Sequence, residues 1–199
     1  MIDPGSQLVV SATDLSFRGT PTSRAGVDMQ SQVNGSIAPS FKVGDRAVHP
    51  SHGVGEVVQL EEKDFGGHRT TCYVLKIVDS DLKVMVPTEA ASRVGLRPVM
   101  KKKEAEKILD ILRAPEVAVD VQPWNRRFRA YTEMLKSGLP AEIAKVLRDM
   151  YRLKFDKDLS FGERRLLDQA RSLLIQELAL AKKVTAASIE GEIQEIFSA

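Results

Sequence analysis

The hydrophobic pattern of the chain changes character near residue 100. Before it, turn signals separate short runs rich in β-branched residues, which lie at 46–48, 54–60, 73–78 and 83–87. Runs of this kind are typical of strands, and the adjacent Gly66 and Gly67 tolerate the positive φ of a tight hairpin. Five short strands within about 60 residues, with no helix between them, predict a small strongly bent sheet or SH3-like barrel over residues 41–99.

From residue 101 onward the apolar residues follow helical spacing. Pro123 suits the first turn of a helix that Gly138 ends, and Pro140 suits the start of the next. Ser160 and Glu163 form a capping box that opens a long helix, and Thr185 caps the last one. The pattern predicts helices over about 101–112, 123–137, from 140, 160–181 and from 185. Residues 100–199 are therefore expected to form a compact all-α bundle of about five helices, which makes the chain an α+β protein of two domains.

Residues 1–40 follow neither pattern. They are rich in Ser, Thr, Gly and Gln, and their two short apolar pieces at 8–10 and 15–17 are too isolated to bury much surface. This segment is predicted to be a disordered amino-terminal extension.

Composition narrows the class of protein. Of the 199 residues 43% are hydrophobic and 28% charged, which is ordinary for a soluble globular protein. No stretch approaches the roughly 18 apolar residues of a membrane span, and no export signal opens the chain. The single cysteine, Cys72, fits a reducing cytoplasm and a buried position in a strand. No self-association surface stands out, so a monomer is expected.

Charge is distributed unevenly along the chain. Residues 101–155 carry 13 Lys and Arg against 8 Asp and Glu, whereas residues 41–100 carry 8 of each. Basic charge is thus concentrated in one part of the helical half, which favours a nucleic-acid surface there.

The stretch 123–131 contains the only tryptophan of the protein and admits two interpretations. One face of the helix predicted there carries four apolar residues at the spacing i, i+4, i+7 and i+11, namely Trp124, Phe128, Tyr131 and Leu135. That spacing alone favours a buried stripe. Alternatively, the arginines close to Trp124 neutralise phosphates while the indole offers an apolar plate to bases. These arginines are Arg126, Arg127 and Arg129.

Catalytic and cofactor motifs do not emerge from the sequence. His49 and His52 flank a turn without nearby acidic or cysteine residues at metal-ligand spacing. The glycines at 55, 66 and 67 lack the context of a phosphate-binding loop, and no nucleophile elbow is present. Neither an enzyme, nor a cofactor, nor a metal site is expected.

Several motifs in fixed order resemble the CarD/CdnL family of bacterial transcription regulators, and its CdnL branch in particular. In the first half they are 41–45, 48–50, 52–55 and 84–87, and in the second half 108–112, 124–128, 146–151, 159–165 and 170–174. The resemblance covers roughly residues 41–198. The acidic stretch and Arg-Gly-Arg-Pro hook of the longer CarD architecture do not follow the helical part.

The resemblance implies a Tudor-like domain at 41–99 that binds the lobe/protrusion region of the RNA polymerase β subunit. Lys63, Met85 and Pro87 match positions on or near the polymerase-facing strands. Because some relatives carry arginine where Met85 stands, apolar packing and main-chain pairing are expected to replace a charged contact there.

The resemblance also implies that residues 100–199 meet promoter DNA at the upstream edge of the transcription bubble, with little sequence specificity. Trp124 matches the family's minor-groove wedge, and Arg126, Arg127 and Arg129 match the basic positions beside it. The wedge then projects from the first turn while the rest of the stripe stays in the core. This implies a non-enzymatic regulator that stabilises open complexes. The alternative is a protein-only adaptor, which docks on polymerase and recruits another factor without touching DNA.

Overall fold

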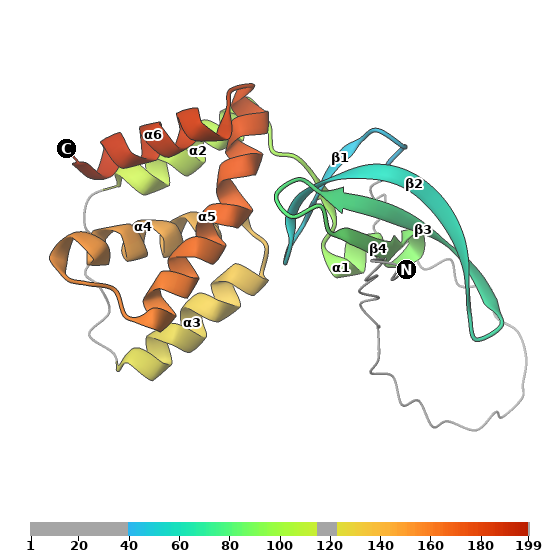
Figure 1. The fold of residues 1–199 in the computed structure, drawn as a ribbon, viewed down its shortest axis with the longest axis horizontal. Helices are drawn as coiled ribbons and strands as arrows, with labels where there is room; N and C mark the ends of the chain where they lie inside the picture. The colour runs from blue at the N-terminus through green and yellow to red at the C-terminus, as the bar shows by residue number, and fades with distance from the viewer. Residues whose placement is uncertain (1–39, 115–122, 199) are drawn as a thin grey trace, which may run out of the picture.

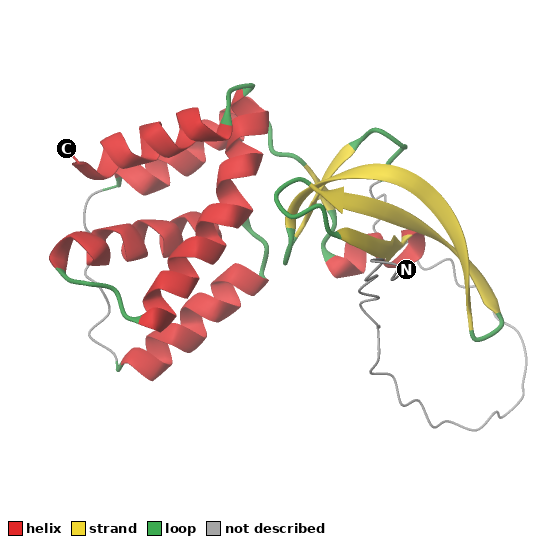
Figure 2. Cartoon of the chain, viewed as in Figure 1, coloured by secondary structure: helices red, strands yellow, loops and turns green. Residues whose placement is uncertain are grey.

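The computed structural model describes residues 40–114 and 123–198. A five-stranded antiparallel sheet lies beside a group of helices, and the chain passes from one to the other near residue 100 (Figures 1 and 2). None of the described helices combines the length and apolar character needed to cross a membrane. The predictions for residues 1–39 and for the connector at 117–121 lie outside the described residues.

The sheet has the strand order β4-β3-β2-β1-β5. Its strands are β1 (Arg46–His49), β2 (Gly53–Phe65), β3 (His68–Ile77), β4 (Lys83–Pro87) and β5 (Arg97–Pro98). The hairpin between β2 and β3 turns at Gly66 and Gly67, which both have positive φ, and the Asp64 carboxylate accepts the Gly67 N–H at 2.7 Å. The hairpin prediction is confirmed. With 13 residues, β2 is longer than the predicted short strand because it continues along β3 beyond a bulge near Val57.

The prediction that no helix interrupts the strands is wrong. A 3-10 turn, η1 (Thr88–Ala90), and a short helix, α1 (Ala91–Val94), lie between β4 and β5. Ala91 is completely buried against the sheet, and Gly95 ends α1 in the left-handed conformation with φ 84°. A helix of one turn has too few residues to show a period, so tertiary packing determines it.

The helical half contains five helices among the described residues, as predicted. They are α2 (Lys102–Arg113), α3 (Trp124–Lys136), α4 (Pro140–Asp156), α5 (Phe161–Lys182) and α6 (Ala186–Ser198). The capping box at the start of α5 is present, since Ser160 and Glu163 exchange main-chain and side-chain hydrogen bonds. Gly138, with φ 66°, follows α3. Local cap chemistry therefore marks the start of α5 and the end of α3.

Two clusters of buried side chains form the interior. One lies between the sheet and α1 and includes Phe41, Val57, Leu75 and Leu96. The other lies among α2–α6 and includes Leu109, Leu135, Leu147, Leu174 and Ile189.

A buried ion pair joins the sheet to the helices. The Glu177 side chain in α5 is only 1% exposed, and both of its oxygens accept from the Arg97 guanidinium at the edge strand β5. The N–H of Met100 donates to the same carboxylate at 3.0 Å, and Arg97 also donates to the Gly138 carbonyl. A buried carboxylate requires such partners, so β5, the segment after it and α5 are held together.

The turn between β1 and β2 forms a second junction. An added Cβ at Gly138 would lie 2.5 Å from the Pro50 Cβ, and one at Gly53 would lie 3.7 Å from the Leu173 Cα of α5. His49, the last residue of β1, is buried and accepts the Ser51 N–H at its Nδ1, while the His52 ring lies 4.8 Å away. The turn is thus packed directly between the sheet and the helices.

We expect Arg97→Ala to lower the free energy of unfolding by roughly 3 kcal/mol, because it leaves the Glu177 carboxylate buried without its counter-ion. Urea denaturation of the unaltered protein and of the variant measures the change in the free energy of unfolding. Lys136→Ala is the matched control, since Lys136 pairs with Glu133 where both side chains are largely exposed, and its loss costs less than about 1 kcal/mol. Equal effects of the two substitutions would contradict this assignment.

Stability is expected to fall as pH drops from 6.5 towards 4. Burial, and secondarily the neighbouring charge of His52, lowers the pKa of His49 from 6.5 to about 4. The unfolded chain takes up this proton near pH 6.5 and the folded chain does so only near pH 4, so the native state loses roughly 2 kcal/mol across that interval.

His49→Asn isolates this contribution, because the asparagine oxygen can still accept the Ser51 N–H but does not titrate. Chemical denaturation at several pH values should give a shallower loss of stability for the variant. Parallel pH profiles for the two proteins would show that His49 does not carry the effect.

Candidate nucleic-acid interface

The start of α3 presents the candidate site. Pro123 is extended, and its carbonyl accepts the N–H groups of Arg126 and Arg127 at 2.9 and 3.2 Å. Trp124 is therefore the first helical residue, and no side chain caps this end of the helix. Main-chain N–H groups at such an end favour anions.

Trp124 is half-buried rather than fully clear of the bundle. Its indole lies 5.5 Å from the Phe128 ring and over Gly162 in the first turn of α5. Tyr131 and Leu135 are buried, and Phe128 is partly buried against the same core. The stripe thus passes gradually from core to surface towards the amino end of α3, and neither interpretation of the spacing describes all of it.

Three arginines follow Trp124 within five positions of α3, and one of them contacts the indole. Arg127 lies with its Cζ 5.8 Å from the indole centroid, a cation–π distance, whereas Arg126 and Arg129 are exposed. None of the three has a carboxylate within 4.0 Å among residues 40–114 and 123–198, and the nearby Glu133 pairs with Lys136 instead. Within the described part, their charge is therefore not answered by an internal anion.

A hydrogen-bonded group behind the site fixes α3 to α4. The Tyr131 hydroxyl donates to Asp149 Oδ2 at 3.2 Å, and Arg148 binds Oδ1 of the same carboxylate at 3.0 Å. Burial, helped by the Asp149 charge, raises the pKa of Tyr131 to about 12, so the phenol keeps its proton and remains a donor. The helix that carries Trp124 is thereby anchored one turn beyond the arginines.

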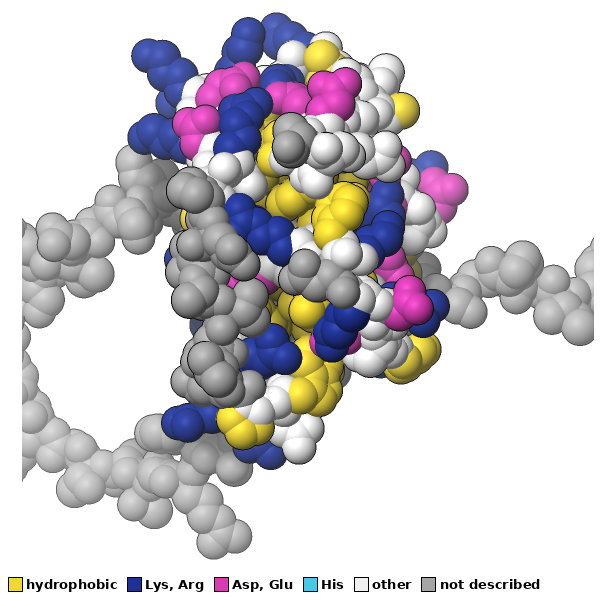
Figure 3. Space-filling view, turned by 90° about the vertical axis from the view of Figure 1, so that its left-hand side faces the viewer, with side chains coloured by type: hydrophobic (Ala, Val, Ile, Leu, Met, Phe, Trp, Pro, Cys, Tyr) yellow, Lys and Arg dark blue, Asp and Glu magenta, His cyan; other side chains and the backbone are white. Residues whose placement is uncertain are grey.

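Sequence reasoning missed Phe161 as a surface residue. Its side chain is 83% exposed, the most among the large hydrophobics of the described residues, and it precedes Gly162 in the turn that contacts Trp124. The capping box was the available signal, because it makes Phe161 the first helical residue. At this end of the bundle apolar side chains lie among Lys and Arg (Figure 3).

The three residues predicted to face polymerase lie on the sheet. Met85 and Pro87 are partly exposed on the edge strand β4. Pro87 lies opposite Cys72 of β3, and Cys72 in turn lies opposite Glu61 of β2. Lys63 binds Glu61 at 2.8 Å, two residues further along β2. Because alternate residues of a strand share a face, all three lie on one face of the sheet. None of them contacts the Trp124 site.

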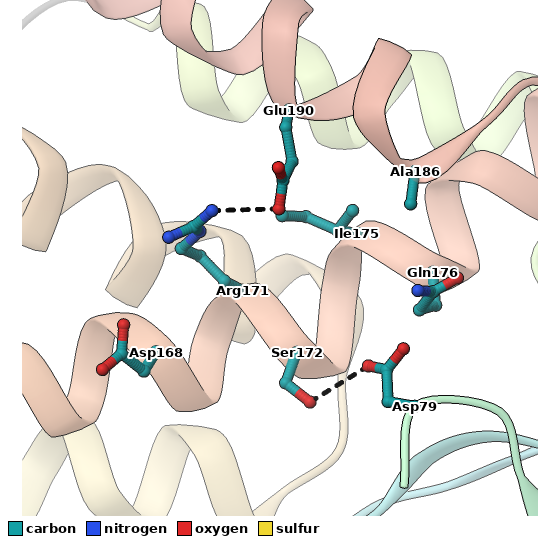
Figure 4. Close-up of a pocket in the computed structure, with 8 residues that line it drawn as sticks. All are labelled: Asp79, Asp168, Arg171, Ser172, Ile175, Gln176, Ala186 and Glu190. Atoms are coloured by element: carbon teal, nitrogen blue, oxygen red, sulfur yellow. Dashed lines mark hydrogen bonds and ion pairs between the residues drawn. The ribbon is translucent and has the colours of Figure 1, made fainter.

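A hollow elsewhere has different chemistry. It lies where α5 and α6 meet the loop at Asp79, and its walls include Asp79, Asp168 and Glu190 (Figure 4). The Arg171 guanidinium there binds Glu190 at 2.9 Å, and Ser172 donates to Asp79 at 3.3 Å. Its lining residues do not include those at the start of α3, so the hollow is separate from the candidate interface.

Comparison with known proteins gives a consistent result. Residues 41–100 match the family model of the CarD-like/TRCF RID domain, and residues 107–194 match that of the CarD C-terminal domain. The chain is also 34% identical over 151 residues to "Putative transcription factor YdeB" of Bacillus subtilis (strain 168), covering 76% of this chain and 98% of that protein. The chain belongs to the CarD/CdnL family. It is thus a CarD/CdnL transcription factor, and the family resemblance is confirmed.

A solved structure, CdnLNt from Myxococcus xanthus, is 41% identical and corresponds to 33% of this CarD/CdnL chain and 93% of its own, with a TM-score of 0.27.

The electrostatic setting of Trp124 is testable without any partner. Iodide should quench the fluorescence of this single tryptophan more efficiently than caesium does, because Arg127 at the ring and the exposed Arg126 and Arg129 on the same helix attract anions and repel cations. Arg126→Ala with Arg129→Ala should reduce the iodide-to-caesium ratio of quenching constants, and Lys136→Ala at the far end of α3 should not. A ratio of one in the unaltered protein would contradict a cationic environment.

Proposed function

We propose that this CarD/CdnL transcription factor joins RNA polymerase to promoter DNA and stabilises the open complex. Residues 41–99 act as a Tudor-like domain that binds the β subunit of polymerase in its lobe/protrusion region. Residues 100–199 act as the domain that contacts DNA. The match of residues 41–100 to an RID-type domain supports the first role, and the basic, aromatic start of α3 supports the second.

One observation carries the proposal for DNA. The lone indole is half-buried at an uncapped helix start, and the Arg127 guanidinium lies over its ring. Arg126 and Arg129 are exposed on the same helix, and none of the three arginines has a carboxylate partner among the described residues. Cations beside an exposed aromatic edge suit a site where phosphates flank an opened base step.

Trp124 acts as a wedge in the minor groove at the upstream edge of the bubble. Unstacking a base step costs a few kcal/mol, and an inserted ring offsets part of that cost. Open promoter DNA is already partly unstacked at its fork, so the wedge binds it more tightly than closed duplex. This difference in affinity shifts the closed–open equilibrium towards the open state. Arg126, Arg127 and Arg129 contribute phosphate contacts, which carry little sequence information.

On the sheet, Lys63, Met85 and Pro87 contribute to the polymerase contact. The strand β4 that carries Met85 and Pro87 is an edge of the sheet, so main-chain groups along it can pair with a strand of a partner. On the face that the three residues share, Met85 and Pro87 provide apolar contact area for the partner and Lys63 provides a positive charge. The protein acts as a monomer.

A second candidate function rests on Phe161. An 83% exposed phenylalanine beside the Trp124 site also suits a protein partner, since exposed aromatics are frequent anchors in protein interfaces. In that case the chain is an adaptor that recruits another factor to polymerase without touching DNA.

Trp124→Ala should shorten the lifetime of the open complex by roughly tenfold to a hundredfold, in keeping with a wedge energy of a few kcal/mol. Its affinity for polymerase should remain unchanged, because Trp124 is remote from the sheet. Competitor-challenge decay of preformed complexes measures the lifetime, and a polymerase binding titration measures the affinity.

Phe155→Ala is the control for loss of an aromatic from the bundle surface, since Phe155 is 62% exposed at the end of α4. It should leave the lifetime unaltered. An unchanged lifetime for Trp124→Ala, with polymerase fully bound, would refute the wedge.

Salt dependence separates the two candidate functions. Each phosphate neutralised contributes roughly 0.9 to the slope of log affinity against log salt. Arg126→Ala and Arg129→Ala should therefore each reduce the slope of DNA binding by about that amount, and Lys136→Ala should not. The adaptor function would be favoured if the affinity for DNA did not depend on salt. It would also be favoured if the polymerase complex showed no contact between this protein and DNA.

A further inference from the structure

Gly162 lies directly beneath the indole of Trp124. A Cβ atom added at Gly162 would lie 3.0 Å from the indole Cζ2, 3.9 Å from its Cε2 and 3.8 Å from the Phe128 Cε2. Carbon atoms that are not bonded prefer a separation of roughly 3.5–4.0 Å. The ring therefore packs on bare main chain, and a side chain at position 162 would require the indole or the helix to shift by a few tenths of an ångström.

The backbone itself gives no reason for glycine at this position. Gly162 lies in the first turn of α5 and is not among the glycines with positive φ. Alanine is a better helix former than glycine. Gly191 in α6 is also helical, but a Cβ added there would have no atom within 4 Å. The contact with Trp124 is thus what distinguishes Gly162.

The turn that holds Gly162 is fixed. Ser160 N–H donates to Glu163 Oε2 at 2.7 Å, Glu163 N–H donates to Ser160 Oγ, and Lys157 binds Glu163 Oε1 at 3.1 Å. Glu163 is 2% exposed, so this cap is part of the packed interior. A side chain at position 162 would therefore displace the indole rather than the helix.

We propose that Gly162 is a positioning residue for Trp124: its missing side chain determines how deeply the indole is buried and how far its edge projects. The Phe128 ring and the Arg127 guanidinium complete the setting of the ring. The position of the indole is independent of any partner. The consequence for promoter DNA rests on the function proposed above.

Gly162→Ala tests the position of the ring in the full-length protein. Because Trp124 is the only tryptophan, its emission reports this site alone. The substitution should shift the emission to longer wavelength and raise the acrylamide quenching constant, since the ring moves away from α5. Gly191→Ala should change neither quantity. Unchanged emission and quenching in Gly162→Ala would overturn the proposal.

Thermal unfolding in a double-mutant cycle gives a second readout. In a Trp124→Ala background, Gly162→Ala should raise Tm as Gly191→Ala does, because only the gain in helix propensity remains. With Trp124 present, the gain should be smaller or reversed. The same Tm change in both backgrounds would contradict a contact between residues 124 and 162.

Open-complex lifetimes connect the position of the ring to function. Gly162→Ala should shorten the lifetime by up to roughly tenfold, and should have no further effect when combined with Trp124→Ala. An additional loss in the combined variant would show that Gly162 acts by another route and would overturn its positioning role. If Trp124→Ala alone leaves the lifetime unchanged, the wedge function fails, whereas the fluorescence result still decides where Gly162 sets the ring.

Discussion

A carboxylate removed from water determines how the two halves of this protein fit together. Glu177 is inside the helical core, where a lone charge would be strongly unfavourable, and Arg97 at the edge of the sheet supplies the opposite charge. The same carboxylate accepts the Met100 N–H at the point where the chain leaves the sheet. An ion pair with this geometry adds directional hydrogen bonds to the junction. Apolar contact alone is not directional and would allow the sheet and the helices to shift relative to each other.

Helix α5 carries this constraint to the candidate interface. Glu177 and Gly162 are both in α5, 15 residues apart, which corresponds to about 22 Å along a helix axis. At one end of this segment Glu177 binds Arg97 of β5, and at the other end Gly162 supports the Trp124 ring. A single continuous helix thus relates the sheet to the indole. In the proposed function, which places one partner on the sheet and another at the indole, a fixed separation of the two surfaces reduces the entropy lost on binding the second.

The sequence predicts the elements best where local chemistry determines them. The cap at Ser160, the proline at position 140 and the paired Gly66 and Gly67 mark boundaries that the structure confirms. Long-range contacts explain what was missed. Glu177 interrupts an apolar face, and its partner Arg97 is 80 positions away, so spacing within the helix cannot identify it. The short helix α1 depends likewise on burial of Ala91 against strands that are distant in sequence.

The half-buried state of Trp124 likewise combines a local pattern with a long-range contact. Spacing assigns the residue to the apolar face of α3, and the first turn of α5 determines how much of that face is covered. A fully buried ring has no free edge, whereas a fully exposed one samples several rotamers and loses that freedom on binding. A ring supported on one side by main chain and contacted by Arg127 keeps a free edge in a restricted orientation. Rigidity and access are compatible here because position 162 has no side chain.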